Sequence, residues 1–545
     1  MKVVPRLSLF FLASLLQRAH NFVLPLGPVS SSGSSLSAVQ HYRLASRQLA
    51  ASTAASTDQM GVSSSKPGGS EDGEILEPQG THHPWWSLAP LNEASQWSSS
   101  PGEYFKDKSD AVGGAPVFKC HPGLASIAVL DHAAGEWFFN QPDSVLDRQL
   151  GARFGPLQCT ETYVGKSLPA LVTNLAEAHP DVRAYTLSIL KERLGSVQSA
   201  WQHSSDNFYK NLWTNGLGEY PTVYDTFLQQ SYSFMLEWVL ATGEEGGQPL
   251  PDFKDFVNVN PVDISVLLKL VVDTPVANAA AKAAQAIAAG LSGTQEASVE
   301  VLLESIRSSR MYPKFVEMLE AQNVDIQDLE NSFMFNTGFQ SSSAIAKQME
   351  YAVGTLSIYP DFLADLRKEL DGKDLTMKNV DDSNEFPLLD SFHWEILRVF
   401  PAPPFFFKKA KMDLLVPTSS GKKYKVKKGD MLCAHHPLIH IDEAAFGPDA
   451  TEFKPRRFID NAALKKKVFA YAFPDPEKTA PKEGMPWGCA AHTAGMLDGA
   501  LKLFYGRWVQ EAEWEMKETP ILDPVKYLGI VGPKGLEFSK VTPRK

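Results

Sequence analysis

The chain contains little cysteine for its 545 residues. Only four cysteines occur, which are Cys120, Cys159, Cys433 and Cys489. They lie far apart and form no Cys-x-x-Cys pair, which argues against a zinc site and against a dense disulfide framework. The histidines His435, His436 and His440 lie beside Pro437 at a predicted strand exit, and we do not expect a metal site there. Each cysteine must therefore be judged alone.

Excess positive charge and long apolar runs are also absent. The net charge is -11, from 52 basic and 63 acidic side chains, so no basic field exists that would bind nucleic acid. Beyond the N-terminal region no run of about eighteen uninterrupted apolar residues occurs, and no membrane span is expected there. The 43% of hydrophobic residues is typical of a globular protein with a sizeable core.

The N-terminal region has a composition of its own. Residues 1–25 carry Lys2 and Arg6 before an apolar stretch of about ten residues, which is too short to cross a bilayer and predicts a signal peptide. Residues 26–75 are rich in Ser, Ala and Gly, which is typical of a transit peptide or a disordered linker. This order resembles the two-part plastid address of algae with secondary plastids, so we expect a plastid protein, with secretion as the alternative. Residues 76–545 are expected to form one folded domain.

Helical periodicity dominates this domain. The predicted helices are residues 180–201, 222–240, 277–291, 298–321, 326–353, 360–370 and 390–399. A short strand that leads into a helix is predicted within residues 125–141, and further short strands at 414–418, 423–434 and 536–541. The pattern predicts a mainly α fold with a minor β region late in the chain.

The segment around Cys489 leaves four possibilities open: a buried structural thiol, a nucleophile, a metal ligand or a haem ligand. A turn-rich stretch precedes Cys489, and residues 489–509 read as one helix, which would place the sulfur at a helix N-terminus. The helix dipole stabilises a thiolate at that position. Ala490, Ala491 and Gly495 leave the flat space that a macrocycle needs, whereas a nucleophile lacks an evident base partner.

Three motifs in a fixed order favour the haem ligand. Glu395 and Arg398 lie at i and i+3 on one predicted helix face, Arg457 follows in "PRRF", and Cys489 comes last. This series resembles the Glu-x-x-Arg, Pro-x-Arg-Phe and haem-cysteine motifs of the cytochrome P-450 superfamily. The resemblance implies the cytochrome P-450 fold and haem b with iron bound by the Cys489 thiolate. It also implies that Glu395, Arg398 and Arg457 brace the cysteine loop and take no part in catalysis.

A central stretch narrows the resemblance to one branch. Gln340 and Ser341 occupy the positions of the acid and the alcohol that deliver protons in oxygen-activating members. The segment with Phe339, Gln340 and Ser341 resembles the Phe-Asn-Ser region of the enzymes that metabolise fatty-acid hydroperoxides. Those enzymes are allene oxide synthases, hydroperoxide lyases, divinyl ether synthases and epoxyalcohol synthases. Phe339, Gln340 and Ser341 are thus the catalytic candidates, and the Gln340 amide is expected to hydrogen-bond an oxygen at the iron.

The same resemblance points to further site residues. Cys159 lies in a stretch similar to the pocket loop of that branch, and Phe405 and Phe407 follow the bracing helix, where the family lines its substrate pocket. Trp487 stands two residues before Cys489, where the family has Arg or a polar residue, and the usual Cys-x-Gly is absent. Trp487 and Arg183 are therefore the candidates for further haem contacts.

The resemblance implies a haem-thiolate isomerase or lyase of polyunsaturated fatty-acid hydroperoxides, leaning towards an epoxyalcohol synthase. A lipid hydroperoxide supplies its own oxidised oxygen, so no reductase is required. The alternatives are an NADPH- and O2-dependent monooxygenase and a haem carrier or sensor without turnover. The lysine-rich stretches 408–428 and 465–467 are expected to be solvated faces, with contact to the substrate carboxylate or peripheral contact to a membrane as the second interpretation. The motifs leave the product type and the choice between 9- and 13-hydroperoxides open.

Overall fold

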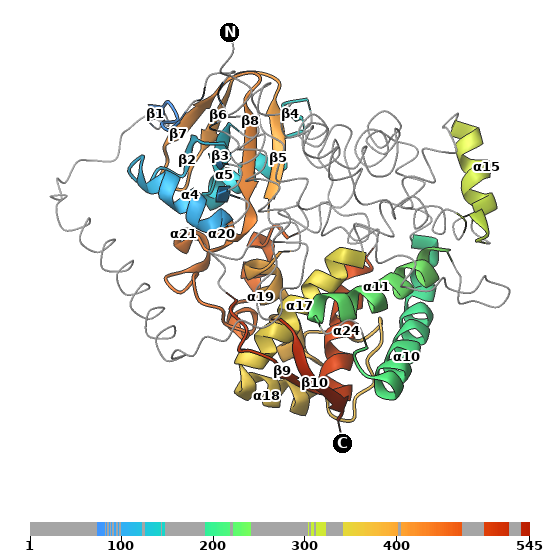
Figure 1. Ribbon diagram of the computed structural model, residues 1–545. Helices are drawn as coiled ribbons and strands as arrows, with labels where there is room; N and C mark the ends of the chain where they lie inside the picture. The colour runs from blue at the N-terminus through green and yellow to red at the C-terminus, as the bar shows by residue number, and fades with distance from the viewer. Residues whose placement is uncertain are drawn as a thin grey trace, which may run out of the picture. The chain divides into compact units, whose positions relative to one another are not determined.

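Helices make up most of the described structure. A computed structural model describes residues 74–147, 191–240, 304–322, 342–470, 495–522 and 536–544, apart from short gaps within these ranges. The longer helices, shown in Figure 1, are α4 (Pro101–Asp110), α5 (His132–Asn140), α10 (Val197–Asn215), α11 (Val223–Leu240), α15 (Tyr312–Gln322), α17 (Ser342–Ile358), α18 (Pro360–Leu370), α19 (Pro387–Val399) and α24 (Leu497–Glu511). Short helical turns are η2 (Arg193–Ser196), α20 (His436–His440), α21 (Glu443–Phe446), α22 (Arg457–Asp460) and η6 (Ala462–Lys467).

The sheets join early and late strands. A five-stranded sheet has the order β2 (Val117–Lys119), β3 (Ile127–Val129), β8 (Met431–His435), β5 (Phe405–Ala410) and β4 (Leu146–Asp147). A three-stranded sheet has the order β1 (Ile75–Leu76), β7 (Lys423–Val426) and β6 (Leu414–Pro417), and β9 (Ala512–Met516) pairs with β10 (Phe538–Pro543). The early strand predicted within residues 125–141 is β3, which leads into α5, whereas the early strands β1, β2 and β4 were not predicted. Early strands such as β3 pair with late ones such as β8, and short strands leave little periodicity to detect.

Several helix boundaries agree with the sequence patterns, because local signals fix them. The helix predicted at 360–370 is α18, and the one predicted at 390–399 is α19, which begins three residues earlier at Pro387. Both helices have proline at their first position, where the missing N–H has no intrahelical partner. The helix predicted at 180–201 overlaps α10, but α10 begins at Val197 and continues to Asn215. The helix predicted at 277–291 lies outside the described ranges.

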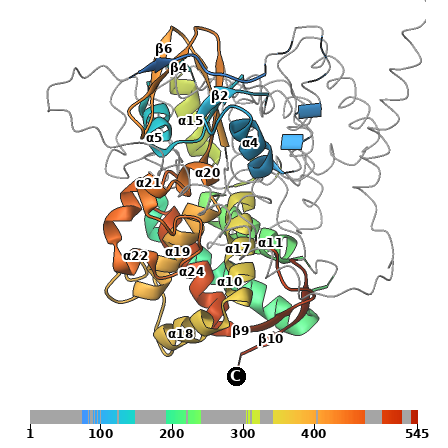
Figure 2. The ribbon, with the colours of Figure 1, turned by 90° about the vertical axis from the view of Figure 1, so that its left-hand side faces the viewer.

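The main core lies among the helices. The apolar side chains of α10, α11, α17, α18, α19 and α24 form one buried cluster, in which α17 packs against both α11 and α24. Figure 2 shows α19 beside α22 and α24, and α19 packs against both. A second buried cluster lies between α5 and the sheets, with Phe138, Val416 and Leu432 among its members. Helix α19 is thus fixed on its apolar face, and its polar residues reach the segments on either side of the Cys489 region.

Candidate functional site

The three predicted brace residues lie together at the C-terminal end of α19. Arg398 is fully buried, and its Nε and Nη2 donate to the two carboxylate oxygens of Glu395 at 2.8 and 2.7 Å. Its Nη1 donates to the carbonyls of His440 and Ala450 at 2.9 and 2.6 Å, and Nη2 also donates to Glu452 O at 2.9 Å. A guanidinium has five N–H donors, so every donor of Arg398 has a partner.

Arg457 approaches the same carboxylate from α22. Its Nε lies 3.2 Å from each carboxylate oxygen of Glu395. Its Nη1 donates to Asp449 Oδ1 at 2.6 Å and to Phe446 O at 3.4 Å, and its Nη2 donates to Asp449 O and Glu452 O at 2.8 and 2.9 Å. One buried carboxylate therefore holds two guanidinium groups, and both of them bind the chain between Phe446 and Glu452.

The charges of this cluster compensate one another. Burial alone would lower the pKa of Arg457, but the carboxylates of Glu395 and Asp449 outweigh it and raise that pKa. Hydrogen bonds from Lys454 and Arg457 lower the pKa of Asp449 to about 2. Arg457 and Asp449 therefore stay ionised at neutral pH, and removing one member of the cluster would leave a buried charge without its partner.

His440 is a member of this cluster that the sequence reasoning considered only as a metal ligand. The Phe469 N–H donates to His440 Nε2 at 2.8 Å, so Nε2 carries no proton and Nδ1 must donate to Arg398 O at 2.8 Å. Burial is the main cause that lowers the pKa of His440 well below 6.5, and nearby His436 lowers it further. A neutral His440 thus connects the end of α19 to Phe469. Its position about forty residues after Arg398 carries no periodic signal.

Two predicted pocket residues share one face of β5. Phe405 and Phe407 are half-buried, with ring centroids 5.4 Å apart, and both pack against Trp97. Phe406 points to the opposite face, where it contacts Phe139 and His436. Because side chains alternate along a strand, Phe405 and Phe407 lie together and Phe406 cannot join them. Whether they line a substrate pocket stays a prediction.

Burial separates the cysteines. Cys120 and Cys433 are fully buried among aromatic and aliphatic side chains, and burial raises the pKa of both thiols. A thiol in such surroundings is not a source of thiolate. Cys159 and Cys489 lie outside the described residues, as do Arg183, Phe339, Gln340, Ser341 and Trp487.

One expectation about the Cys489 segment is wrong. Residues 489–509 do not form a single helix, because Gly495 has a φ of 82°, in the left-handed region, and α24 begins only at Leu497. The run of small residues mimics helix periodicity, but glycine permits the left-handed turn that interrupts it. The N-terminus of α24 is therefore at Leu497 and not, as the sequence pattern had suggested, at Cys489.

The lysines of the two stretches that were expected to be solvated differ in their exposure to solvent. Lys408 is 2% exposed, and its Nζ donates to Phe138 O at 2.8 Å, because β5 brings it against the C-terminal turn of α5. Lys465 forms an ion pair with Asp390 at 2.5 Å. Lys466 is exposed, as the prediction requires. Clusters of charge in a sequence do not show which members a tertiary partner will bury.

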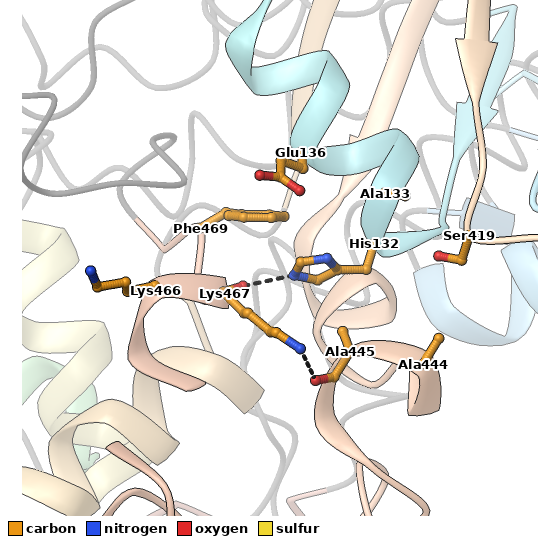
Figure 3. Close-up of a pocket in the computed structure, with 9 residues that line it drawn as sticks. All are labelled: His132, Ala133, Glu136, Ser419, Ala444, Ala445, Lys466, Lys467 and Phe469. Atoms are coloured by element: carbon orange, nitrogen blue, oxygen red, sulfur yellow. Dashed lines mark hydrogen bonds between the residues drawn. The ribbon is translucent and has the colours of Figure 1, made fainter. Parts of the chain in front are cut away.

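A surface cavity of about 370 Å³ lies between α5, α21 and η6. Figure 3 shows His132 and Phe469 at its wall, with Lys467 donating to Ala445 O at 2.7 Å and His132 Nε2 lying 3.0 Å from Lys467 O. None of the predicted site residues that the structure describes lines it. In the part of the chain that the structure describes, no cluster of His, Cys, Asp and Glu has the geometry of a metal site, and no helix has the length and apolarity to cross a membrane.

The helical fold and the cluster of Glu395, Arg398 and Arg457 indicate one class of protein, and sequence comparison identifies the family. Residues 316–473 match the cytochrome P-450 family model. An epoxyalcohol synthase of Ectocarpus siliculosus is 65% identical over 475 residues, which cover 87% of this chain and 100% of that protein. The chain belongs to the cytochrome P-450 family.

Two further relatives extend the comparison. A hydroperoxide bicyclase of Ectocarpus siliculosus, named as mitochondrial, is 56% identical and covers 87% of this chain and 92% of its own. A mitochondrial hydroperoxide bicyclase of Plasmodiophora brassicae is 32% identical over 84% of this chain and 81% of its own. The resemblance to the hydroperoxide-metabolising branch is therefore confirmed.

The described residues fit the haem-thiolate cofactor of this family. The chain between Phe446 and Glu452 is tied to α19 by two fully bonded guanidinium groups. Burial excludes Cys120 and Cys433 as thiolate donors, which leaves Cys159 and Cys489. Of these two, only Cys489 follows Arg457 in the order of the family motifs.

The plastid expectation is wrong. The bicyclases of Ectocarpus siliculosus and Plasmodiophora brassicae are both named as mitochondrial. The error has a chemical cause: plastid and mitochondrial leaders are both rich in Ser and Arg and poor in acids, so the composition of residues 26–75 fits either organelle.

Proposed function

We propose that this protein is a haem-thiolate isomerase or lyase of polyunsaturated fatty-acid hydroperoxides, and that its main product is an epoxyalcohol. The observation that carries the proposal is the 65% identity to an epoxyalcohol synthase across the whole of that relative. The bicyclase at 56% identity also has a hydroperoxide in its name, which favours this substrate class over monooxygenation. A bicyclic product is the second candidate for the same substrate.

Haem b is the proposed cofactor, with Cys489 as its thiolate ligand. When bound, the haem supplies an iron centre at which the O–O bond of a hydroperoxide is cleaved. Glu395, Arg398 and Arg457 hold the chain that precedes the cysteine segment, so their role is to fix the ligand and not to react. Trp487 and Arg183 are the proposed further haem contacts.

Product outcome is proposed to depend on the distal side of the haem. Gln340 offers two N–H donors, which would hold the substrate oxygen close to the carbon radical and favour return of a hydroxyl group. Phe339 and Ser341 flank it in the sequence. Phe405 and Phe407, together on one face of β5, are the proposed contacts of the acyl chain, and Cys159 is the proposed contact from the earlier pocket loop. Alanine at Phe405 or Phe407 should change the product pattern, whereas alanine at Phe406, on the opposite face, should not.

Incubation of purified protein with a linoleate hydroperoxide in the absence of NADPH tests the function. We expect rapid loss of hydroperoxide and epoxyalcohols as the main products by mass spectrometry. Unreacted hydroperoxide, together with hydroxylation of free fatty acid when NADPH and a reductase are added, would instead establish the monooxygenase. Binding without either product would establish a haem carrier.

We further propose that residues 1–75 form a mitochondrial leader that precedes the catalytic domain at 76–545. The support is the naming of two relatives and the composition of residues 26–70, in which Asp58 is the single acid. Under this proposal the signal-like residues 1–25 are the start of that leader. A fluorescent protein fused after residue 75 should enter mitochondria in algal cells, and its appearance in the secretory pathway would refute the proposal.

Peripheral membrane contact is proposed at the tip formed by the turns before β6 and after β7. Met412 is 46% exposed there, beside exposed Lys427 and Lys428. The nearby carboxylate of Asp413 accepts from the Lys428 backbone N–H at 2.8 Å, so it is turned towards the chain. Each lysine near an anionic membrane contributes about 1 kcal/mol. Flotation with anionic vesicles should therefore weaken in a Lys427→Gln/Lys428→Gln protein and not in a Lys517→Gln/Lys540→Gln control.

A further inference from the structure

A second polar cluster on α19 lies one to two turns before Glu395. Asp390 is 4% exposed, and each of its carboxylate oxygens accepts from a different lysine. Oδ1 accepts from Lys502 Nζ at 2.8 Å, and Oδ2 accepts from Lys465 Nζ at 2.5 Å. Lys502 is itself 3% exposed and also binds Asp381 Oδ1 at 2.8 Å. One carboxylate thus bridges two ammonium groups.

The two lysines come from opposite sides of the proposed haem-ligand segment. Lys465 belongs to η6, which ends at Lys467 before Cys489 in the sequence, whereas Lys502 belongs to α24, which begins at Leu497 after it. A second link between α19 and α24 supports the same arrangement, since His393 Nε2 lies 2.8 Å from Asp498 Oδ1. Asp390 therefore connects one helix to both flanks of the cysteine segment.

The charges favour a persistent connection. Burial raises the pKa of Asp390, but the ammonium groups of Lys502 and Lys465 outweigh it and hold that pKa below the usual value. Burial likewise lowers the pKa of Lys502, and the carboxylates of Asp390 and Asp381 raise it above the usual value. Asp390 and Lys502 therefore both stay charged at neutral pH, and charged hydrogen bonds are about twice as strong as neutral ones.

We propose that Asp390 is a positioning residue for the haem: by holding Lys465 and Lys502 together it fixes both ends of the segment that carries Cys489. This inference rests on the proposed haem-thiolate function. The brace of Glu395, Arg398 and Arg457 acts only on the chain before the cysteine, whereas Asp390 also acts on the chain after it. Fixing both ends reduces the conformations open to the segment between them.

The expected change in the rate of haem release follows from the behaviour of groups that support metal ligands. Loss of such a group typically weakens metal binding or activity by about 10- to 100-fold. Lys465→Met removes only the link before the cysteine, and Asp390 keeps Lys502. We therefore expect haem to leave the Lys465→Met protein about tenfold faster than the wild type. Lys466→Met is the matched control, because Lys466 is the exposed neighbour and Asp390 is not its partner.

Haem transfer to an excess of apomyoglobin measures this rate, and the ferrous-carbonyl Soret band reports whether the thiolate stays bound. The Lys465→Met protein should lose haem and its thiolate band faster than the Lys466→Met protein under conditions in which both proteins are fully folded. A second variant, Asp390→Val/Lys465→Met/Lys502→Met, replaces each charged side chain by an apolar one of roughly comparable size and so avoids an unpaired charge at Asp390. It should fold and lose haem faster still.

The outcomes separate the two proposals. Equal haem release and equal thiolate bands in the Lys465→Met and Lys466→Met proteins would overturn the positioning role of Asp390. Absence of the thiolate band from the wild-type protein would instead overturn the haem-thiolate function. Faster haem loss from the Lys465→Met protein that appears only where this protein is partly unfolded would show a purely structural role and would also overturn the inference.

Discussion

Two adjacent arginines provide the sharpest test of the brace, because the sequence makes them alike and the structure does not. Arg457 is 6% exposed and uses every N–H donor on Glu395, Asp449 and three carbonyls. Arg456 has a half-exposed side chain that pairs with Asp365 at 2.5 Å. Lysine keeps the charge at either position and offers three donors in place of five.

Arg457→Lys should therefore leave at least two of these acceptors without their donor. Each such loss costs about 1 to 3 kcal/mol when the acceptor is buried, and Glu452 O keeps its bond from Arg398, so we expect a destabilisation of about 2 to 4 kcal/mol. An exposed ion pair contributes less than about 1 kcal/mol, which sets the expectation for Arg456→Lys.

Urea unfolding followed by far-ultraviolet circular dichroism, together with haem content, measures both effects. The Arg457→Lys protein should unfold at a lower urea concentration and retain less haem, and the Arg456→Lys protein should resemble the wild type. If the free energies of unfolding of the two variants agree within about 0.5 kcal/mol, the donor count is not what makes Arg457 important, and the reasoning fails.

Four further predictions address the rest of the site. Glu395→Ala should yield haem-poor or misfolded protein, since breaking a buried charge pair costs about 3 to 5 kcal/mol, and a haem-replete variant with only a slower rate would contradict the brace. Cys489→Ala should abolish the thiolate Soret band while Cys433→Ala keeps it, and the opposite pattern would reassign the ligand. Gln340→Leu should slow hydroperoxide consumption by about 10²-fold or shift the products with an unchanged haem spectrum, whereas wild-type turnover would mean that the Gln340 side chain does not act on the substrate oxygen. Below pH 6.5 His440 is protonated in the unfolded chain and stays neutral in the folded protein, so the free energy of unfolding falls on acidification by up to about 1.4 kcal/mol per pH unit. Urea titrations at several pH values should show a smaller fall for a His440→Gln protein.

Sequence alone determined the features that depend on local signals or on motif order. Helix α18 begins at Pro360 and α11 ends at Leu240 as their patterns predict, because proline, capping and apolar spacing act within a few residues. The order of Glu395, Arg398, Arg457 and Cys489 was enough to indicate the family. Composition did not identify the organelle, because plastid and mitochondrial leader peptides have similar amino-acid compositions.

Tertiary structure alone decided which polar residues cooperate. Lys465 and Lys466 are neighbours of the same type, yet only the first meets Asp390, because α19 brings that carboxylate beside η6. His440 is neutral because packing buries its ring, while a backbone N–H from Phe469 fixes its tautomer, and no pattern of residues encodes either contact. Gly495 interrupts an apparently continuous helix through a positive φ that composition permits but does not require. Contacts between distant segments depend on packing geometry, which a local pattern of residues cannot specify.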